Sequence, residues 1–273
     1  MQTKVANLSD RSVRYLEGGA GRPLIWLHAF PLSAEHWLPE LHRVPPGWRV
    51  IAPDLRGFRG VGPSFEHVGL DSASMATHAA DVLELMSHLE ADRPVVGGMS
   101  MGGYIAFALM RKAASRIAGL ILADTRATAD SPETIAARDR MIAIAQRDGV
   151  AGVAREMVPA LLGTTTHREQ PDLDEVLTRL ITANSTDGVI AGLLAIRQRT
   201  DSTDLLRGIA CPTLVLRGEE DAIITAADAR EMARAIPGAE LVTIPGAGHL
   251  PNLEAPLLFS KAVREFLATI PPV

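Results

Sequence analysis

The sequence of 273 residues contains one cysteine, few aromatic residues and no long apolar run. With Cys211 alone, a disulfide within the chain and a metal site built from several cysteines are both excluded. No stretch of about 18 consecutive apolar residues is present, so no membrane-spanning helix is predicted. The N-terminus also lacks the apolar stretch of a signal peptide, and we therefore expect a cytoplasmic protein.

Positive charge is not in excess either. Lysine and arginine number 27 against 32 acidic residues, which gives a formal net charge of -5. Nucleic acid is therefore not an expected partner, because phosphate contacts need clustered Lys and Arg. Apolar residues make up 47% and charged residues 22% of the chain, the balance of a globular protein. The length suits one large domain, or one domain with an insertion.

Short apolar runs alternate with helical patterns along most of the chain. The runs at 12–17 and 23–28 flank a glycine-rich turn and predict an antiparallel hairpin. Further runs have the continuous apolar character of strands buried on both faces, and helical patterns lie between them. These runs are 48–54, 93–99, 118–124, 211–218 and 239–246. The alternation predicts an α/β fold with a mainly parallel sheet flanked by helices.

One interval, 125–208, has no strand-like run and only helical patterns. Its first helix should have Ser131 as the N-cap, Pro132 at the first helical position and Gly149 as the stop. Three more helices are expected, within 150–163, 171–184 and 185–199. We interpret 125–208 as a helical cap inserted into a core made of 1–124 and 209–273.

Residues 97–104 read GGMSMGGY and lie between an apolar strand and a helical pattern. A sharp turn there would force Ser100 into a strained backbone conformation, and side chains at 98 and 102 would collide. Glycine at both positions removes that obstacle and leaves one hydroxyl exposed at the carboxyl end of the strand. This pattern is the G-x-S-x-G nucleophile elbow, so Ser100 is the candidate nucleophile.

A serine hydroxyl needs a base, and the base needs an acid that fixes its tautomer. His249 is the candidate base because it follows the last predicted strand, at the sheet edge expected for Ser100. Two residues that end strands could supply the acid, Asp221 and Asp124. We favour Asp221, which keeps the order Ser, Asp, His along the chain. Its neighbours at 219 and 220 are then expected to be turn residues that face solvent.

The oxyanion of the reaction needs hydrogen-bond donors. One should be the backbone N–H of Met101, at the start of the helix after the serine. The second should be the backbone N–H of Phe30, in the loop HAFP after an apolar run. His28 in the same loop is expected to order the loop by hydrogen bonds rather than to take part in catalysis.

Together these segments resemble the α/β-hydrolase superfamily, and in particular its capped esterase, perhydrolase and enol-lactonase group. The resemblance rests on the motifs HAFP, DLRG, GMSMGG, RGEEDAIIT and GAGHLPNLEAP, which follow one another in the expected order. It implies an eight-stranded sheet, a cap after the sixth strand and a serine mechanism without a cofactor. Two features depart from the family pattern: His28-Ala29 replaces the usual His-Gly, and the segment 54–64 is longer.

The expected function is hydrolysis of small carboxylic esters through an acyl-enzyme. A lactone hydrolase similar to 3-oxoadipate enol-lactonase, and a cofactor-free perhydrolase similar to haloperoxidases, remain alternatives, as does a ligand-binding protein with hardly any turnover. A lactone with a second carboxylate could be bound by Arg138, Arg140 or Arg197. The simpler interpretation is that these arginines lie on helix faces exposed to solvent. The expected partner is a small-molecule ester, with no metal and no cofactor. The sequence leaves open whether the chain forms a homo-oligomer.

Overall fold

The computed structural model describes residues 1–59 and 70–271 of the chain. Its centre is an eight-stranded sheet of order β1-β2-β4-β3-β5-β6-β7-β8. From β4 across to β8 all neighbours are parallel, while β1 and β2 run antiparallel. The strands are β1 (Gln2–Asn7), β2 (Ser12–Gly19), β3 (Arg22–Leu27), β4 (Trp48–Pro53), β5 (Val95–Met99), β6 (Gly119–Ala123), β7 (Thr213–Gly218) and β8 (Glu240–Ile244). The predicted α/β class and mainly parallel sheet are confirmed.

The predicted hairpin is wrong. Strands β2 and β3 follow each other in sequence, but β4 lies between them in the sheet, antiparallel to β2 and parallel to β3. The glycine-rich turn reverses the chain, but β2 and β3 on either side of it do not pair with each other, because both of them pair with β4. Strand β1 was not predicted, since as an edge strand it pairs with β2 alone and most of its side chains are exposed. Its sequence therefore carries no apolar pattern.

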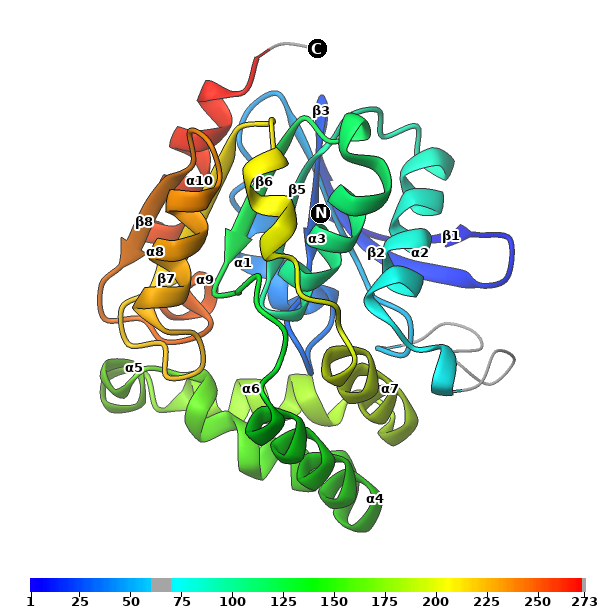
Figure 1. Ribbon diagram of the computed structural model, residues 1–273, viewed down its shortest axis with the longest axis vertical. Helices are drawn as coiled ribbons and strands as arrows, with labels where there is room; N and C mark the ends of the chain where they lie inside the picture. Colours follow the sequence, from blue (N-terminus) through cyan, green and yellow to red (C-terminus); the bar gives the residue numbers. More distant parts are fainter. Residues whose placement is uncertain (60–69, 272–273) are drawn as a thin grey trace.

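Helices cover both faces of the sheet. In Figure 1, α2, α3 and α8 lie in front of it, and α1 and α10 lie behind. The flanking helices are α1 (Leu38–Leu41), α2 (Met75–His88), α3 (Met101–Ala113), α8 (Ala226–Ala235), α9 (Pro251–Glu254) and α10 (Pro256–Thr269). Single 3-10 turns are η1 (Ala34–Trp37), η2 (Leu70–Ser72), η3 (Ala114–Arg116) and η4 (Thr203–Gly208). The layered arrangement explains why the central strands are apolar on both faces.

Four further helices lie together below the sheet in Figure 1. They are α4 (Pro132–Leu161), α5 (Thr164–Glu169), α6 (Asp172–Thr182) and α7 (Thr186–Arg197), called here the helical segment. Ser131 caps α4 by accepting a hydrogen bond from the Thr134 N–H, as predicted. Gly149 interrupts α4, with φ 65° and ψ -167°, and the helix then continues. The predicted stop is therefore a kink.

The two chain connections between the helical segment and the sheet lie side by side. The Ser202 N–H donates to the Ala127 carbonyl at 2.8 Å, and the Ala129 N–H donates to the Asp201 carboxylate at 3.0 Å. The Arg199 guanidinium also donates to the Thr128 carbonyl at 2.8 Å. The segment that leaves the sheet and the segment that returns to it are thus hydrogen-bonded to each other.

Among the described residues, no helix combines the length and the apolarity that crossing a membrane requires. The segment 54–64, expected to be longer than in the family pattern, lies partly outside the described residues, at 60–64.

Glu40 on α1 is a buried acid whose ionisation should govern the pH dependence of stability. The Ser260 hydroxyl on α10 contacts both of its carboxylate oxygens at 3.0 Å. Burial raises the pKa of Glu40 from 4.5 to about 7. Because the folded chain holds this proton more tightly than the unfolded chain, the stability contribution is present below pH 4.5 and is lost as the pH rises to about 7.

We therefore expect Glu40→Gln to raise the free energy of unfolding at pH 8 by about 2–3 kcal/mol and to change it little at pH 4.5. Urea unfolding of the variant and the parent chain at both pH values measures the difference. Glu231→Gln, at an exposed position of α8, serves as the control and should show no such pH dependence. An equal effect of Glu40→Gln at both pH values would contradict the assignment.

Candidate active site

Ser100 forms the sharp turn between β5 and α3. Its φ of 52° and ψ of -112° are unfavourable for any residue with a Cβ, at a cost of about 1–3 kcal/mol. Its N–H donates to the Ala123 carbonyl at 2.9 Å, and its own carbonyl accepts the Thr125 hydroxyl at 2.9 Å. Ser100 is partly exposed, whereas Met99 and Met101 are fully buried. The fold thus holds one hydroxyl out at the end of the strand.

The glycines around Ser100 are required by close packing. A Cβ at Gly98 would lie 2.2 Å from the carbonyl oxygen of Gly102, and one at Gly102 would lie 2.1 Å from that of Leu27. A Cβ at Gly103 would lie 2.4 Å from the hydroxyl oxygen of Thr125, beyond the end of β6. Each contact is impossible for a real side chain. The predicted reason for the glycine-rich sequence is therefore confirmed.

His249 and Asp221 form a buried hydrogen-bonded pair. His249 Nδ1 lies 2.8 Å from Asp221 Oδ2, while Asp221 Oδ1 accepts the N–H groups of Ile223 and Ile224 at 2.8 and 3.1 Å. Burial alone would raise the pKa of Asp221, but the charge and hydrogen bond of His249 and the Ile223 N–H outweigh it and lower that pKa. With Nδ1 donating to the carboxylate, Nε2 is the basic nitrogen.

Asp124, the other candidate acid, lies beside this pair without bonding to the imidazole. Its Oδ1 accepts the Gly218 N–H at 2.8 Å. Its Oδ2 is buried and has no hydrogen-bond partner among the described residues. A proton on Oδ2 would make it a hydrogen-bond donor. Burial and the nearby charge of Asp221 raise the pKa of Asp124 well above its usual value. The structure therefore brings His249 together with Asp221, and gives Asp124 the character of a neutral acid.

The same three groups have ligand atoms within 4.8 Å of one another, close enough to share a metal ion. The hydrogen bond between His249 and Asp221 already uses the Nδ1 and Oδ2 atoms that a metal would need. A base held by an orienting carboxylate fits this set of groups better than a metal centre does.

Ser100 and Asp221 follow strands that are two positions apart in the sheet, β5 and β7, with β6 between them. The Ser100 N–H is bonded to residue 123 on β6, and Asp124 is bonded to Gly218 on β7. Because adjacent strands are about 4.8 Å apart, the ends of β5 and β7 lie within roughly 10 Å. No hydrogen bond joins Ser100 Oγ to His249 in the part of the chain that the structure describes. Such bonds are often long before substrate binds.

The two backbone amides predicted for the oxyanion site are those of Met101 and Phe30. Met101 is the first residue of α3, where an N–H group has no carbonyl one turn earlier in the helix. Phe30 follows β3, and its buried ring packs edge-on against Phe58 at 6.1 Å between ring centroids. The next carbonyl, of Pro31, accepts the side-chain amide of Asn184 at 2.9 Å, so the helical segment braces this loop.

His28 orders the loop as predicted. The Leu55 N–H donates to His28 Nε2 at 3.1 Å, so Nδ1 carries the proton and donates to the Ala29 carbonyl at 3.0 Å. Burial lowers the pKa of His28 to about 3, which keeps the ring neutral. The methyl group of Ala29, where the family has glycine, is fully buried and accommodated in the core.

Glu254 is a residue beside the candidate site that the sequence did not reveal. Its buried carboxylate accepts the N–H groups of Gly248 and Leu250, on either side of His249, at 2.9 and 3.0 Å. It also accepts the Gly163 N–H and the Thr166 hydroxyl of the helical segment, both at 2.7 Å. One side chain therefore fixes the histidine loop and attaches the helical segment to it.

We expect Glu254→Gln to lower the free energy of unfolding by about 2–4 kcal/mol, because an amide N–H₂ would face N–H donors that now meet a carboxylate. Activity should also fall, by about tenfold or more, as the loop holding His249 loosens. Urea unfolding and steady-state rates measure both effects. Glu265→Gln, at an exposed site on α10, is the matched control. Equal stability of the two variants would show that Glu254 does not hold the loop.

Glu220 was predicted to face solvent; it is partly exposed, but its carboxylate is also bound by the helical segment. Its carboxylate accepts the hydroxyls of Thr164 and Thr165 at 2.8 and 2.6 Å and the Thr165 N–H at 2.8 Å. Glu219 is exposed, as expected, and accepts the Gly246 N–H at 3.1 Å. The turn before Asp221 is thus a second attachment point for the helical segment, beside the one at Glu254.

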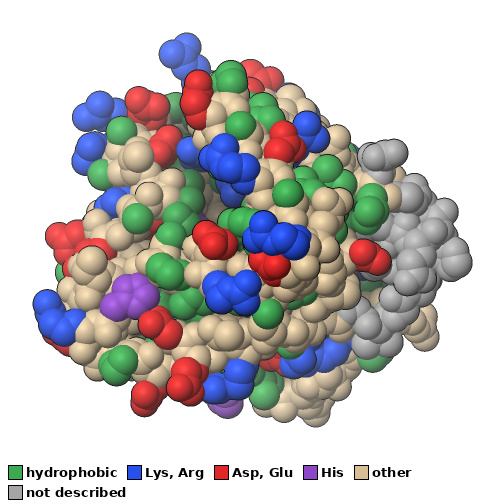
Figure 2. Space-filling model, turned by 90° about the horizontal axis from the view of Figure 1, so that it is seen from below, with side chains coloured by type: hydrophobic (Ala, Val, Ile, Leu, Met, Phe, Trp, Pro, Cys, Tyr) green, Lys and Arg blue, Asp and Glu red, His purple; other side chains and the backbone are tan. Residues whose placement is uncertain are grey.

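The arginines considered for a second substrate carboxylate are engaged elsewhere or exposed. Arg197 pairs with Asp139 at 2.9 Å, and Arg138 pairs with Asp130 at 3.3 Å. Figure 2 shows the molecule from below, and basic and acidic side chains are intermixed on the face it displays. Arg140 is exposed. These observations favour solvated helix faces over a binding site for a dicarboxylate.

Comparison with known proteins places this geometry in a family. The model of the Alpha/beta hydrolase family matches residues 24–262. A thermophilic esterase from Thermogutta terrifontis, solved with malate bound, is 39% identical, with a TM-score of 0.91 and 99% of both chains covered. The enol-lactonase from Burkholderia xenovorans LB400 is 26% identical, with a TM-score of 0.87, covering 97% of this chain and 100% of that one.

A further relative is the non-heme haloperoxidase of Rhodococcus erythropolis, 28% identical over 254 residues, which are 86% of this chain and 88% of the relative. The esterase and the enol-lactonase structures thus have the same fold as this chain. The chain belongs to the alpha/beta hydrolase family.

Proposed function

We propose that the protein is a carboxylesterase that cleaves small carboxylic esters through an acyl-enzyme formed on Ser100. The observation that carries the proposal is the buried 2.8 Å pair of His249 and Asp221, at the same edge of the sheet as the turn that carries Ser100. A serine presented on a strained turn beside a carboxylate-bound imidazole has the components of a nucleophile, a base and an orienting acid. The family in turn implies hydrolase activity.

In the first step, Ser100 Oγ attacks the ester carbonyl carbon and His249 Nε2 takes the hydroxyl proton. The carbonyl oxygen becomes an oxyanion, which the N–H groups of Phe30 and Met101 stabilise. As the tetrahedral intermediate collapses, His249 returns the proton to the departing alkoxide. An alcohol leaves, and the acyl group remains esterified to Ser100.

In the second step, His249 takes a proton from water, and the resulting hydroxide attacks the acyl carbon. The bond to Ser100 Oγ breaks, Ser100 regains a proton from His249, and a carboxylic acid is released. Asp221 remains ionised throughout and stabilises the imidazolium that forms in each step. His249 accepts a proton twice and gives one up twice, so the starting enzyme is restored and no cofactor is consumed.

The helical segment is proposed to act as the cap over this site. Its Leu161 carbonyl accepts the His249 N–H at 3.2 Å, and its attachments to Glu254 and Glu220 lie in the loops that carry His249 and Asp221. On the other side, Gly192 of α7 lies against Phe30, since a Cβ there would be 3.0 Å from the Phe30 ring. A substrate would therefore lie between these helices and the strand ends.

A substrate panel tests the assignment. The purified protein is expected to hydrolyse p-nitrophenyl acetate or butyrate with kcat/KM at least about tenfold above that for an enol-lactone. Peracid formation from acetate and hydrogen peroxide should also be slower than ester turnover, although the same residues would catalyse it. A lactone as the best substrate would replace the ester assignment, and faster peracid formation would favour a perhydrolase. The paired state of Arg138 and Arg197 supports the ester.

A further inference from the structure

Asn184 joins the helical segment to two loops at the carboxyl ends of the strands. It lies between α6 and α7 and is buried. Its Nδ2 donates to the Pro31 carbonyl, in the loop after β3, at 2.9 Å, and its Oδ1 accepts the Arg59 N–H, beyond the end of β4, at 3.0 Å. A carbonyl can only accept and an N–H can only donate, so these two partners fix the orientation of the amide. Both ends of one neutral side chain thus hold the two loops.

Helix α7, which begins two residues after Asn184, packs directly against the same two loops. A Cβ at Gly188 would lie 1.7 Å from the carbonyl oxygen of Gly57, and one at Gly192 would lie 3.0 Å from the Phe30 ring. Because these positions have no side chain, the backbone of α7 approaches the loops closely. Packing as well as hydrogen bonds therefore fixes Asn184 relative to the loops.

Two peptide groups connect Asn184 to the predicted oxyanion donor. The first consists of the Pro31 carbonyl and the Leu32 N–H, and the second consists of the Ala29 carbonyl and the Phe30 N–H. The Leu32 N–H donates to the Ala29 carbonyl at 2.9 Å, which joins the two groups. Among the described residues the Phe30 N–H has no acceptor. A series of hydrogen bonds therefore runs from Asn184 through both peptide groups and ends at an N–H that can still donate.

Each hydrogen bond in this series affects the next one. Because a peptide group is planar, a donor held at its C=O also fixes the direction of its N–H. The same donor polarises the group and strengthens the hydrogen bond that its N–H makes. The Ala29 carbonyl also accepts His28 Nδ1 at 3.0 Å, so the core holds the second peptide group from its own side. Asn184 supplies the corresponding bond from the helical segment.

We propose that Asn184 is a positioning residue for the oxyanion site, which orients and polarises the Phe30 N–H through the peptide groups 31–32 and 29–30. The inference rests on the proposed esterase function, since only then does this N–H meet an oxyanion. The helical segment then contributes to transition-state stabilisation and does more than cover the substrate. Loss of an interaction with the developing oxyanion alone lowers kcat and leaves KM nearly unchanged.

Asn184→Ala and Asn184→Asp test the proposal with p-nitrophenyl butyrate. Both variants lack the donor to Pro31, while the nearly isosteric aspartate keeps an acceptor for the Arg59 N–H. We expect each variant to lower kcat by about tenfold and to change KM by less than about twofold. Inhibition by an alkyl trifluoromethyl ketone, whose adduct with Ser100 carries an oxyanion, should weaken by about the same factor as kcat.

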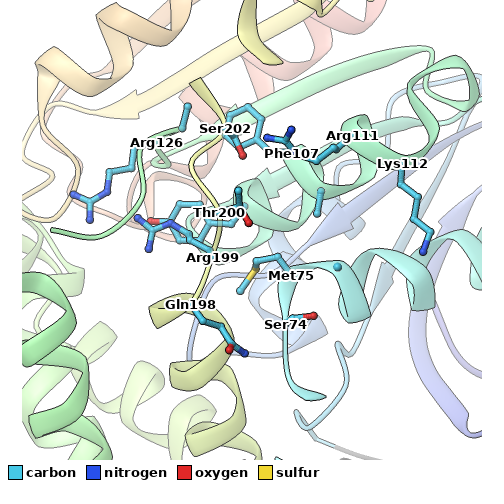
Figure 3. A pocket seen from close by; sticks show the side chains of 14 residues that line it. Ser74, Met75, Phe107, Arg111, Lys112, Arg126, Gln198, Arg199, Thr200 and Ser202 are labelled. Carbon is cyan, nitrogen blue, oxygen red and sulfur yellow. The ribbon is translucent and has the colours of Figure 1, made fainter. Parts of the chain in front are cut away.

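Gln198→Ala is the matched control. Gln198 also belongs to the connection that the helical segment makes with the core, and its side-chain amide donates to the Ala73 carbonyl. It lines a cavity between α2, α3 and the connections to the helical segment (Figure 3), and neither Pro31 nor Asn184 lines that cavity. The control should keep the kcat, the KM and the inhibition constant of the parent chain.

Amide hydrogen exchange gives a measurement that does not depend on ester hydrolysis. The Leu32 N–H should exchange at least about tenfold faster in Asn184→Ala than in the parent chain or in Gln198→Ala. Parent-like Leu32 exchange or parent-like kcat in Asn184→Ala would overturn the proposal. Full activity of Asn184→Asp would also overturn it, because only the bond to Arg59 would then matter. These results would leave the esterase assignment intact. A parent chain inactive on every ester would overturn that assignment instead, and Leu32 exchange would still decide whether Asn184 holds the loop.

Discussion

Replacing Ser100 with alanine should lower kcat for p-nitrophenyl butyrate by about 10⁴- to 10⁶-fold while the fold is retained. The reason is that Ser100 supplies the hydroxyl on the strained turn at the end of β5, and the proposed mechanism needs that hydroxyl as its nucleophile. Steady-state hydrolysis measures kcat, and circular dichroism measures whether the fold is retained. Ser115→Ala, at an exposed position, is the control and should keep full activity. Residual ester hydrolysis above about 10% in Ser100→Ala would remove Ser100 from the mechanism.

The same position offers a separate test of backbone strain. Alanine keeps the Cβ that makes a φ of 52° unfavourable, whereas glycine does not. Ser100→Gly should therefore unfold with a free energy about 1 kcal/mol or more above that of Ser100→Ala, although both variants lack the nucleophile. Urea unfolding of the two inactive proteins gives the comparison. Equal stabilities would mean that the turn is relaxed in solution.

Asparagine at position 221 should lower kcat by about 10⁴-fold, because an amide cannot hold the imidazole in the required tautomer or stabilise its protonated form. Asparagine at position 124 should cost less than about tenfold. Asp124 already has the raised pKa of a neutral acid, and an amide can likewise accept the Gly218 N–H while donating toward Asp221. Both variants replace an aspartate with an asparagine, and they differ only in which of two neighbouring strand ends carries the change.

Ester hydrolysis by both variants over the range of pH decides between the acids. If Asp124→Asn proves the more damaging change, the acid belongs to the end of β6 and the 2.8 Å bond to Asp221 has another purpose. Asp124→Leu adds a further comparison, since leucine removes both the donor and the acceptor. We expect it to be more harmful than Asp124→Asn, because the buried Asp221 carboxylate loses a neighbour that can donate a hydrogen bond.

The sequence predicted features that depend on local constraints. The glycines at 98, 102 and 103 are needed because backbone or side-chain atoms lie within 2.4 Å of any Cβ there, and such a requirement leaves a visible pattern. Buried central strands need apolar residues on both faces, which also shows in the sequence. The nucleophile turn and the parallel strands could therefore be found without coordinates.

Features that depend on distant partners were missed. Strand β1 is mostly exposed and polar, so nothing in its residues indicates a strand. The pairing of β2 with β4 cannot be read from a glycine turn that is equally suited to a hairpin. Glu254 gains its importance from Gly163, 91 residues earlier, and Glu220 from Thr165, 55 residues earlier. A glutamate in a loop looks the same in sequence whether it meets water or such partners.

The hydrogen bond between Ser202 and Ala127, 2.8 Å long, has a consequence for how the protein can evolve. Because the departing and returning chains meet at one point, the stretch between them can be lengthened, shortened or exchanged without moving the ends of β6 and β7. A replacement stretch would, however, have to bring its own donors for Glu254 and Glu220, which Gly163, Thr165 and Thr166 now supply. Variation in length is therefore expected to concentrate in the parts of this stretch that lie away from those residues.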